Sequence, residues 1–127
     1  MAIPPEPPVC RDPEKLNPEF RARAARVLER LKAAGTPFHY GETLRSVERQ
    51  QWLFRYRKGA TKCDGIKNLS RHQSGNAADV YPDGFKAIPP HEHPVWNALA
   101  DAAEAEGLES GHRWGWDSPH IELVTKR

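Results

Sequence analysis

The sequence predicts a small α+β domain in which helices pack on one side of a short, mainly antiparallel sheet. At 127 residues the chain is long enough for one domain but too short for two ordinary ones, and a hydrophobic content of 38% implies a compact core. Several segments carry apolar residues at spacings of three and four, which is typical of helices with one buried face. Short strand candidates lie between them, without internal repeats.

The N-terminal segment, residues 1–17, is predicted to form an extended arm. Residues 1–18 hold six of the twelve prolines, and proline resists both helix interiors and sheets. We favour an arm that lies on the domain over a proline-rich ligand for another protein. The folded domain is then expected to span residues 18–127.

A first helix is predicted from Asn17 to about Gly35. Asn17 is a suitable N-cap, Pro18 suits the first helical position, and Glu19 places an acid in the first turn. The apolar stripe of this helix consists of Phe20, Ala24, Val27, Leu28 and Leu31.

Residues 38–40 form a strand candidate that leads toward a second helix. Ser46 can cap this helix, which is expected to run through Lys58 and to end at Gly59. Arg45 then lies at the junction between strand and helix, and residues 60–70 form a loop. The residues of this helix expected to be buried are Trp52, Leu53 and Tyr56.

The C-terminal half supplies two further strands and a third helix. Residues 76–81 are predicted as a strand that ends in a turn at residues 82–84, and a loop extends to residue 93. Pro94 can begin a helix that continues to Gly107, and residues 120–124 alternate like a terminal strand. The apolar face of the helix consists of Val95, Trp96, Leu99, Ala102 and Ala103.

Two polar blocks carry the candidate chemistry. His72 and Asp79 lie seven residues apart, and Asp117 and His120 lie three apart beside a proline. Two imidazoles and one carboxylate give a metal three protein ligands, which leaves the fourth position of a tetrahedral zinc open, as in catalytic zinc sites. A turn around Gly75 can bring His72 back over the strand that carries Asp79.

These blocks resemble the zinc D,D-carboxypeptidase and L-alanyl-D-glutamate endopeptidase family, peptidase family M15. That family includes vancomycin-resistance dipeptidases and many phage endolysins. The matching pattern is Ser-x-His-x-x-Gly-x-Ala-x-Asp over residues 70–79 and Asp-x-Pro-His-x-Glu over residues 117–122, together with Leu44-Arg45-Ser46 and Gln50. The resemblance implies the fold shared by these peptidases and the hedgehog signalling domain.

The resemblance also implies roles for individual residues. It implies one Zn²⁺ ion held by His72, Asp79 and His120, although this ligand set also suits manganese, cobalt or nickel. It implies that Asp117 is the general base, which takes a proton from the attacking water and delivers one to the leaving amine. It implies that Arg45 holds the developing oxyanion or a substrate carboxylate. The plainer alternatives are a turn residue for Asp117 and a surface salt bridge for Arg45.

Several other side chains are candidates for supporting or substrate-binding roles. Ser70 and Gln50 are expected to contact the substrate or the frame of the site. Trp114 is a candidate for the wall of the cleft, with aromatic core packing as the alternative. Glu122 lies on the same strand face as His120 and either accepts the free N–H of a ligand imidazole or is plainly exposed.

The remaining histidines are not expected to bind metal. His91 and His93 form a His-x-His pair in a proline-rich loop and are expected at the surface, and His39 is expected to be structural. His112 lies in residues 110–116, where many members of the family have a Trp-Gly-Gly-x-Trp-like segment. The chain departs from that pattern, which affects the shape of the specificity pocket more than the zinc site.

Charge and composition limit the classes of partner. Residues 1–75 hold 15 Lys/Arg against 8 Asp/Glu, but we favour a solvated helix face over attraction to an anionic polymer. No specific nucleic-acid binding is expected, because no recognition motif is present. No apolar run approaches the ~20 residues that span a bilayer, so no membrane insertion is expected. Cys10 and Cys63 are expected to be free thiols rather than a bridge.

The sequence therefore predicts a monomeric zinc peptidase that acts on the stem peptides of bacterial peptidoglycan. Without a recognisable signal peptide, it is expected to be made in the cytoplasm and to reach the wall after release, like a phage lysin. Cleavage between L-Ala and D-Glu is the leading activity, and D-Ala-D-Ala carboxypeptidase or dipeptidase activity is second. The alternative from another class is a non-catalytic, zinc-containing wall-binding module, which the presence of Asp117 disfavours.

Overall fold

The computed structural model describes residues 3–57, 63, 65 and 70–124. In chain order, the elements are η1 (Pro13–Lys15), α1 (Pro18–Ala33), β1 (Phe38–Tyr40), α2 (Val47–Tyr56), β2 (Ala77–Pro82), α3 (Val95–Ala105), β3 (Glu109–Ser110), η2 (Gly111–Trp114) and β4 (His120–Glu122). The four strands form an antiparallel sheet in the order β1-β2-β4-β3. The predicted α+β class is confirmed.

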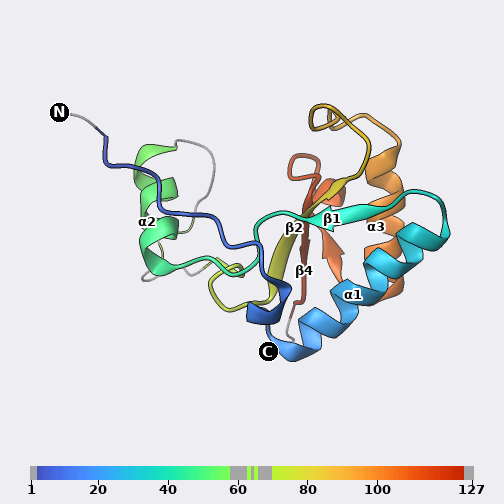
Figure 1. The fold of residues 1–127 in the computed structure, drawn as a ribbon, viewed down its shortest axis with the longest axis horizontal. Coiled ribbons are helices and arrows are strands. Elements are labelled where there is room, and N and C mark those ends of the chain that lie inside the picture. Colours follow the sequence, from blue (N-terminus) through green and yellow to red (C-terminus); the bar gives the residue numbers. More distant parts are fainter. Residues whose placement is uncertain (1–2, 58–62, 64, 66–69, 125–127) are drawn as a thin grey trace.

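Helices α1 and α3 pack together on the same side of the sheet, whereas α2 stands apart from them (Figure 1). The sequence placed all the helices in one layer, so this part of the prediction is wrong for α2. Helix α1 begins as predicted, because Asn17 Oδ1 accepts the Glu19 N–H at 3.1 Å. Its apolar stripe and that of α3 meet in the core, where Phe20 and Trp96 are both fully buried.

The basic face of α1 holds the end of α3. Glu106 accepts from Arg26 at 2.6 Å and from Arg30 at 2.7 Å, and its backbone carbonyl accepts from Arg23 at 2.9 Å. These contacts give part of the arginine stripe a structural role. They agree with the helix-face interpretation of the basic N-terminal half.

Helix α2 turns a different face inward from the one predicted. It ends at Tyr56, before Lys58, and its buried residues are Arg49, Gln50 and Leu53. Trp52 and Tyr56 are only half-buried and contact each other, with ring centroids 5.6 Å apart. The prediction for these two aromatic residues is wrong because α2 packs on a polar cluster and on the arm instead of the sheet. Lys58, Gly59 and most of the predicted 60–70 loop lie outside the described residues.

The N-terminal arm runs along α2 (Figure 1). Trp52 Nε1 donates to the carbonyl of Pro4 at 2.8 Å, and Glu6 accepts from Arg49 at 2.7 Å and from Arg57 at 2.9 Å. No disulfide forms between the two cysteines, both of which are among the described residues. None of the helices in the described part of the chain is long and apolar enough to cross a membrane.

Strands β2 and β4 build the centre of the molecule. Their register places Asp79 directly opposite His120. The segment after Gly107, which the sequence left without an element, forms β3 and then the 3-10 helix η2. The pairing of β3 with β4 puts η2 next to the turn that leads into His120.

Candidate active site

The structure brings together the three predicted metal ligands. Asp79 Oδ1 lies 3.5 Å from His72 Nε2 and 3.5 Å from His120 Nδ1. One ligand atom from each residue lies within 4.8 Å of the other two. His72 comes from the loop before β2, Asp79 from β2 itself, and His120 from the first position of β4.

Gly75 makes the reversal that places His72 over β2. It has φ +78, a conformation that L side chains rarely adopt, and a Cβ there would lie 2.9 Å from the backbone nitrogen of Asn17. That nitrogen donates to the carbonyl of Gly75 at 3.0 Å. The turn expected from the sequence around Gly75 is therefore present and is fixed against the start of α1.

Hydrogen bonds define the tautomer of both histidines. His72 Nδ1 lies 3.0 Å from the carbonyl oxygen of Thr43, which can only accept, so Nδ1 carries the hydrogen and Nε2 faces Asp79. His120 Nε2 lies 2.8 Å from Glu122 Oε1 and donates to it, which leaves Nδ1 facing Asp79. Arg71 in turn holds Glu122 at 2.9 Å. Of the two alternatives for Glu122, the buried partner of a histidine is the one found.

The donor atoms fit a divalent metal ion. His120 Nδ1 is buried and has no hydrogen-bond partner within the described residues, although it points at the other two ligand atoms. Burial opposes ionisation of Asp79, but His120 and His72 hold the pKa of its carboxyl well below the usual range. Two nitrogens and one carboxylate oxygen are a donor set that zinc accepts.

Proton and metal compete for His120. Burial lowers its pKa, but the carboxylates of Asp79 and Glu122 outweigh this effect and raise the pKa to about 9. Since a metal needs the deprotonated nitrogen, binding near neutral pH is expected to release a proton.

The Glu122→Gln variant is expected to bind zinc roughly 10–100-fold more weakly than the parent, because it removes the charge that orients and polarises His120. Competition with a chromogenic chelator measures this affinity. Glu104→Gln is the control, since Glu104 is an exposed acid whose side chain contacts Arg113. Equal zinc affinities of the parent and Glu122→Gln would contradict this role.

Asp117 lies beside the cluster, on the turn that leads into β4. Its Oδ2 is 3.8 Å from His120 Nδ1. Burial raises the pKa of the Asp117 carboxyl, an effect that His120 opposes and Asp79 reinforces. Gly111 is required for this placement, because a Cβ there would lie 2.1 Å from the backbone oxygen of Asp117. The position and the raised pKa suit an acid-base group.

Arg45 is part of a buried polar cluster rather than of the surface. Its side chain is only 10% exposed and donates to Glu42 at 2.7 Å and to Gln50 at 2.8 Å. Its backbone N–H donates to the carbonyl of His72 at 2.9 Å, which ties it to the metal cluster. These contacts rule out the surface salt bridge considered from the sequence. Each terminal guanidinium nitrogen has a second N–H, and the side chain lines the cleft described below.

Ser70 and Gln50, which were expected to contact the substrate or the frame of the site, both support the frame. Gln50 is fully buried, and its amide nitrogen donates to the carbonyl of Cys63 at 2.7 Å while its oxygen accepts from Arg45. Of the two alternatives expected for Gln50, its buried position favours the frame of the site over contact with substrate. Ser70 Oγ accepts the His72 backbone N–H at 3.2 Å, so it orders the loop that carries this ligand.

Trp114 lies against the metal cluster, with its ring 5.3 Å from that of His120. It is 39% exposed, and Trp116, whose ring is 6.0 Å away, is 65% exposed. This exposure excludes the alternative of aromatic core packing. Contact between Trp114 and substrate stays a prediction.

The expectation that His91 and His93 are simple surface residues is wrong. Both are half-buried, and His93 Nδ1 accepts the Val95 N–H at 3.0 Å at the start of α3. His91 Nδ1 and His112 Nδ1 contact the buried hydroxyl of Ser118 at 2.7 and 3.0 Å. These bonds join the loop after β2 to the Asp117–His120 turn. Sequence spacing gave no signal for this contact.

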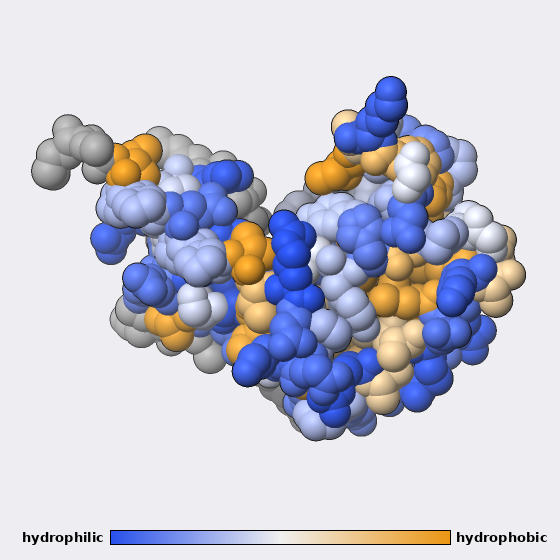
Figure 2. All heavy atoms as spheres, viewed as in Figure 1, coloured by the Kyte–Doolittle hydropathy of each residue, from blue (hydrophilic) through white to orange (hydrophobic). Residues whose placement is uncertain are grey.

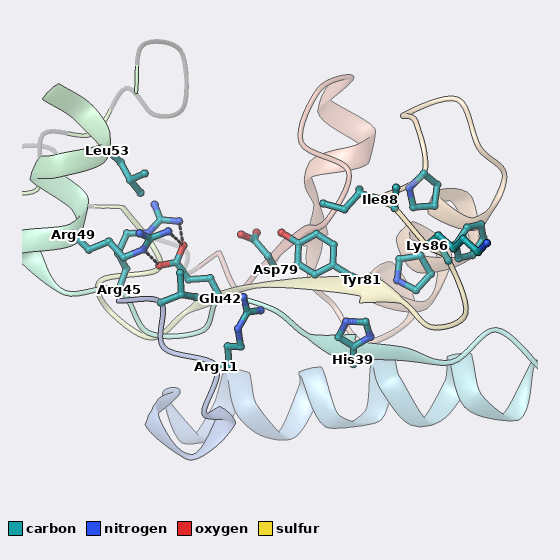
Figure 3. A pocket seen from close by; sticks show the side chains of 15 residues that line it. Arg11, His39, Glu42, Arg45, Arg49, Leu53, Asp79, Tyr81, Lys86 and Ile88 are labelled. Atoms are coloured by element: carbon teal, nitrogen blue, oxygen red, sulfur yellow. Dashed lines mark hydrogen bonds and ion pairs between the residues drawn. The ribbon is translucent and has the colours of Figure 1, made fainter. Parts of the chain in front are cut away.

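A cleft of ≈ 540 Å³ opens beside Asp79. In the view of Figure 2 the surface is hollowed between the α2 side of the molecule and the loop after β2, and Figure 3 shows the side chains that line the cleft. The lining residues include Arg11 of the arm, Arg45, Tyr81 and Lys86. Gln50, Ser70 and Trp114 are not among them.

Comparison with known proteins agrees with this site. Residues 64–123, which hold all three candidate ligands and Asp117, match the family model described as D-alanyl-D-alanine carboxypeptidase. A search of curated protein sequences finds no significant match.

Solved structures share the fold over most of their length. The L-Ala D-Glu endopeptidase ChiX of Serratia marcescens is 27% identical, with a TM-score of 0.61 and coverage of 88% of this chain and 83% of that one. The L,D-carboxypeptidase DacB of Streptococcus pneumoniae is 24% identical, with a TM-score of 0.60 and coverage of 87% and 67%.

A mutant of the vancomycin resistance D,D-pentapeptidase VanY from a VanB-type resistance cassette, in complex with Zn(II), is 17% identical. Its TM-score is 0.60, and the coverage is 87% of this chain and 73% of that one. The family match over residues 64–123, the shared fold and the His-Asp-His cluster agree, and together they make the chain similar to the M15 family of peptidoglycan-hydrolysing metallopeptidases.

Proposed function

We propose that the protein is a zinc-dependent endopeptidase that cleaves the bond between L-Ala and D-Glu in the stem peptide of peptidoglycan. The observation that carries the proposal is the buried His72-Asp79-His120 cluster with the Asp117 carboxyl beside it and a cleft at its edge. The choice of bond is supported by ChiX, an L-Ala D-Glu endopeptidase that is 27% identical to this chain.

The residues divide the work as follows. His72, Asp79 and His120 would hold one zinc ion, which when bound supplies Lewis-acid activation of the carbonyl and of the attacking water. Asp117 accepts the proton of that water and passes one to the leaving amine, and its raised pKa favours both steps. Arg45 lines the cleft, where guanidinium N–H groups can bind developing negative charge or a carboxylate.

Removal of a terminal D-Ala is the second candidate. The matching family model, described as D-alanyl-D-alanine carboxypeptidase, favours it, whereas DacB is named an L,D-carboxypeptidase and VanY a D,D-pentapeptidase. At 24% and 17% identity these two structures support the fold alone. A non-catalytic binding module is disfavoured, because it gives no reason for a half-buried carboxyl such as Asp117 beside the metal ligands.

Mass spectrometry of purified peptidoglycan, digested with and without a strong chelator, separates these activities. Chelator-sensitive fragments with a new N-terminal D-Glu are expected. Release of free D-Ala instead would select the carboxypeptidase. Absence of cleavage across several wall types by a folded, zinc-loaded sample would overturn both in favour of the binding module.

A further inference from the structure

Arg11 is the residue on which this inference depends. It comes from the N-terminal arm, lines the cleft beside Asp79, and points toward the space between Glu42 and Tyr81 (Figure 3). Its guanidinium makes no hydrogen bond or ion pair with any described residue, and the side chain is exposed. An unpaired guanidinium that faces into a cleft is suited to bind a carboxylate.

The backbone of Arg11 is clamped on both sides by one residue, Thr43. The Thr43 N–H donates to the carbonyl of Cys10 at 2.8 Å, and Thr43 Oγ1 donates to the carbonyl of Asp12 at 2.9 Å. The carbonyl of Thr43 also accepts from the ring of the metal ligand His72 at 3.0 Å. Thr43 is fully buried, so it fixes the base of Arg11 relative to the metal cluster.

The charged side chains that line the cleft are compatible with the binding of an anion. Glu42 is shared by Arg45 and Arg49, and Glu6 also pairs with Arg49, so these groups neutralise one another. Besides these, the charged side chains in the lining are Arg11, Lys86 and the carboxylate of Asp79. With Asp79 bound to a cation, the cleft would be net positive and would favour an anionic substrate.

We propose that Arg11 binds the α-carboxylate of the D-Glu residue in the substrate and so selects stem peptides in which this carboxylate is free rather than amidated. The inference rests on the proposed endopeptidase function. It identifies the α-carboxylate of D-Glu as the part of the substrate that the N-terminal arm binds. Because Thr43 connects Arg11 to His72, binding of that carboxylate sets which peptide bond reaches the metal cluster. Arg11 is then a specificity-determining residue that the arm contributes to the site.

Two synthetic stem peptides test this inference. They differ only in whether the D-Glu α-position is a carboxylate or a carboxamide, and kcat and KM are measured for each with the zinc-loaded protein. The parent protein is expected to prefer the carboxylate about tenfold or more in kcat/KM. Arg11→Gln is expected to lose this preference mainly through KM, and Arg11→Lys to keep part of it.

Lys32→Gln is the matched control, because it removes the same charge from an exposed position of α1 away from the cleft. It is expected to keep the full preference. An Arg11→Gln variant that discriminates as well as the parent, or a parent without preference, would overturn the role of Arg11.

Failure of the proposed function is distinguishable from failure of this inference. If the parent protein cleaves neither peptide, the proposed endopeptidase function is wrong. Binding of the two uncleaved peptides is then measured by calorimetry. Tighter binding of the carboxylate form to the parent, but not to Arg11→Gln, supports the inference. Equal binding by both proteins overturns it.

Discussion

Replacing Asp117 by asparagine is expected to reduce kcat by roughly 10²–10⁴ while leaving the metal in place. The side chain keeps its size, so the turn between Gly111 and His120 should be retained, but an amide cannot accept the proton of the attacking water. Asp117 Oδ2 lies 3.8 Å from His120 Nδ1, farther than the Asp79 oxygen at 3.5 Å, and the three other groups already supply a ligand set.

Steady-state hydrolysis and metal content, measured on the same preparation, separate the possible outcomes. Asp101→Asn is the control, because Asp101 is an exposed aspartate of α3 that contacts Arg113 at 2.6 Å. A folded Asp117→Asn variant with full activity would remove Asp117 from the mechanism. Loss of the metal together with activity would identify Asp117 as a ligand instead of a base.

The centre of the site could be predicted because it depends on local sequence. The Gly75 turn and the strand that follows it bring His72 near Asp79 within one short segment. The alternation of the last strand places His120 and Glu122 on one face, and the structure shows them in contact. Local sequence does not determine the long-range pairing of β2 with β4, which places Asp79 directly opposite His120.

The support of the site could not be predicted in the same way. Thr43 holds His72 through its backbone carbonyl, a group that every residue possesses and that therefore leaves no mark in the sequence. The Ser118 hydroxyl joins His91 and His112, which are distant in sequence and in different loops. The buried side chains of α2 are mainly polar, because the helix packs against a charged cluster rather than an apolar layer.

Glu42 is the residue of that charged cluster with the largest expected effect on stability. It is buried between Arg45 and Arg49, and both guanidinium groups contact its carboxylate (Figure 3). Its backbone carbonyl also accepts from the N–H of Asp79 at 2.8 Å. Loss of the charge leaves two nearly buried cations without their shared partner.

Glu42→Gln is therefore expected to lower the free energy of unfolding by about 3–5 kcal/mol at pH 7. For a domain of this size, that corresponds to a fall in Tm on the order of 10 °C. Glu14→Gln is the matched control, because Glu14 also pairs with an arginine, at 3.1 Å, but its side chain is 77% exposed. A surface pair of this kind contributes about 0–1 kcal/mol. Equal losses in the two variants would show that burial of the pair does not matter.

The same carboxyl gives the effect a defined pH dependence. Burial raises the pKa of Glu42, but Arg45 and Arg49 outweigh it and hold the pKa below its ordinary value of 4.5. The stabilisation is therefore fully present above pH 4.5, the pKa expected in the unfolded chain, and is lost as the pH falls through the lower folded-state pKa.

The difference in unfolding free energy between the parent and Glu42→Gln should consequently shrink as the pH falls below 4.5, the ordinary pKa of glutamate. Urea unfolding of both proteins across this range, with chelator present throughout so that metal release does not contribute, measures the difference. A gap that stays constant would mean that the charge of Glu42 is not what holds the cluster together. A gap that closes would show that the cleft wall beside Asp79 depends on one ionised carboxyl.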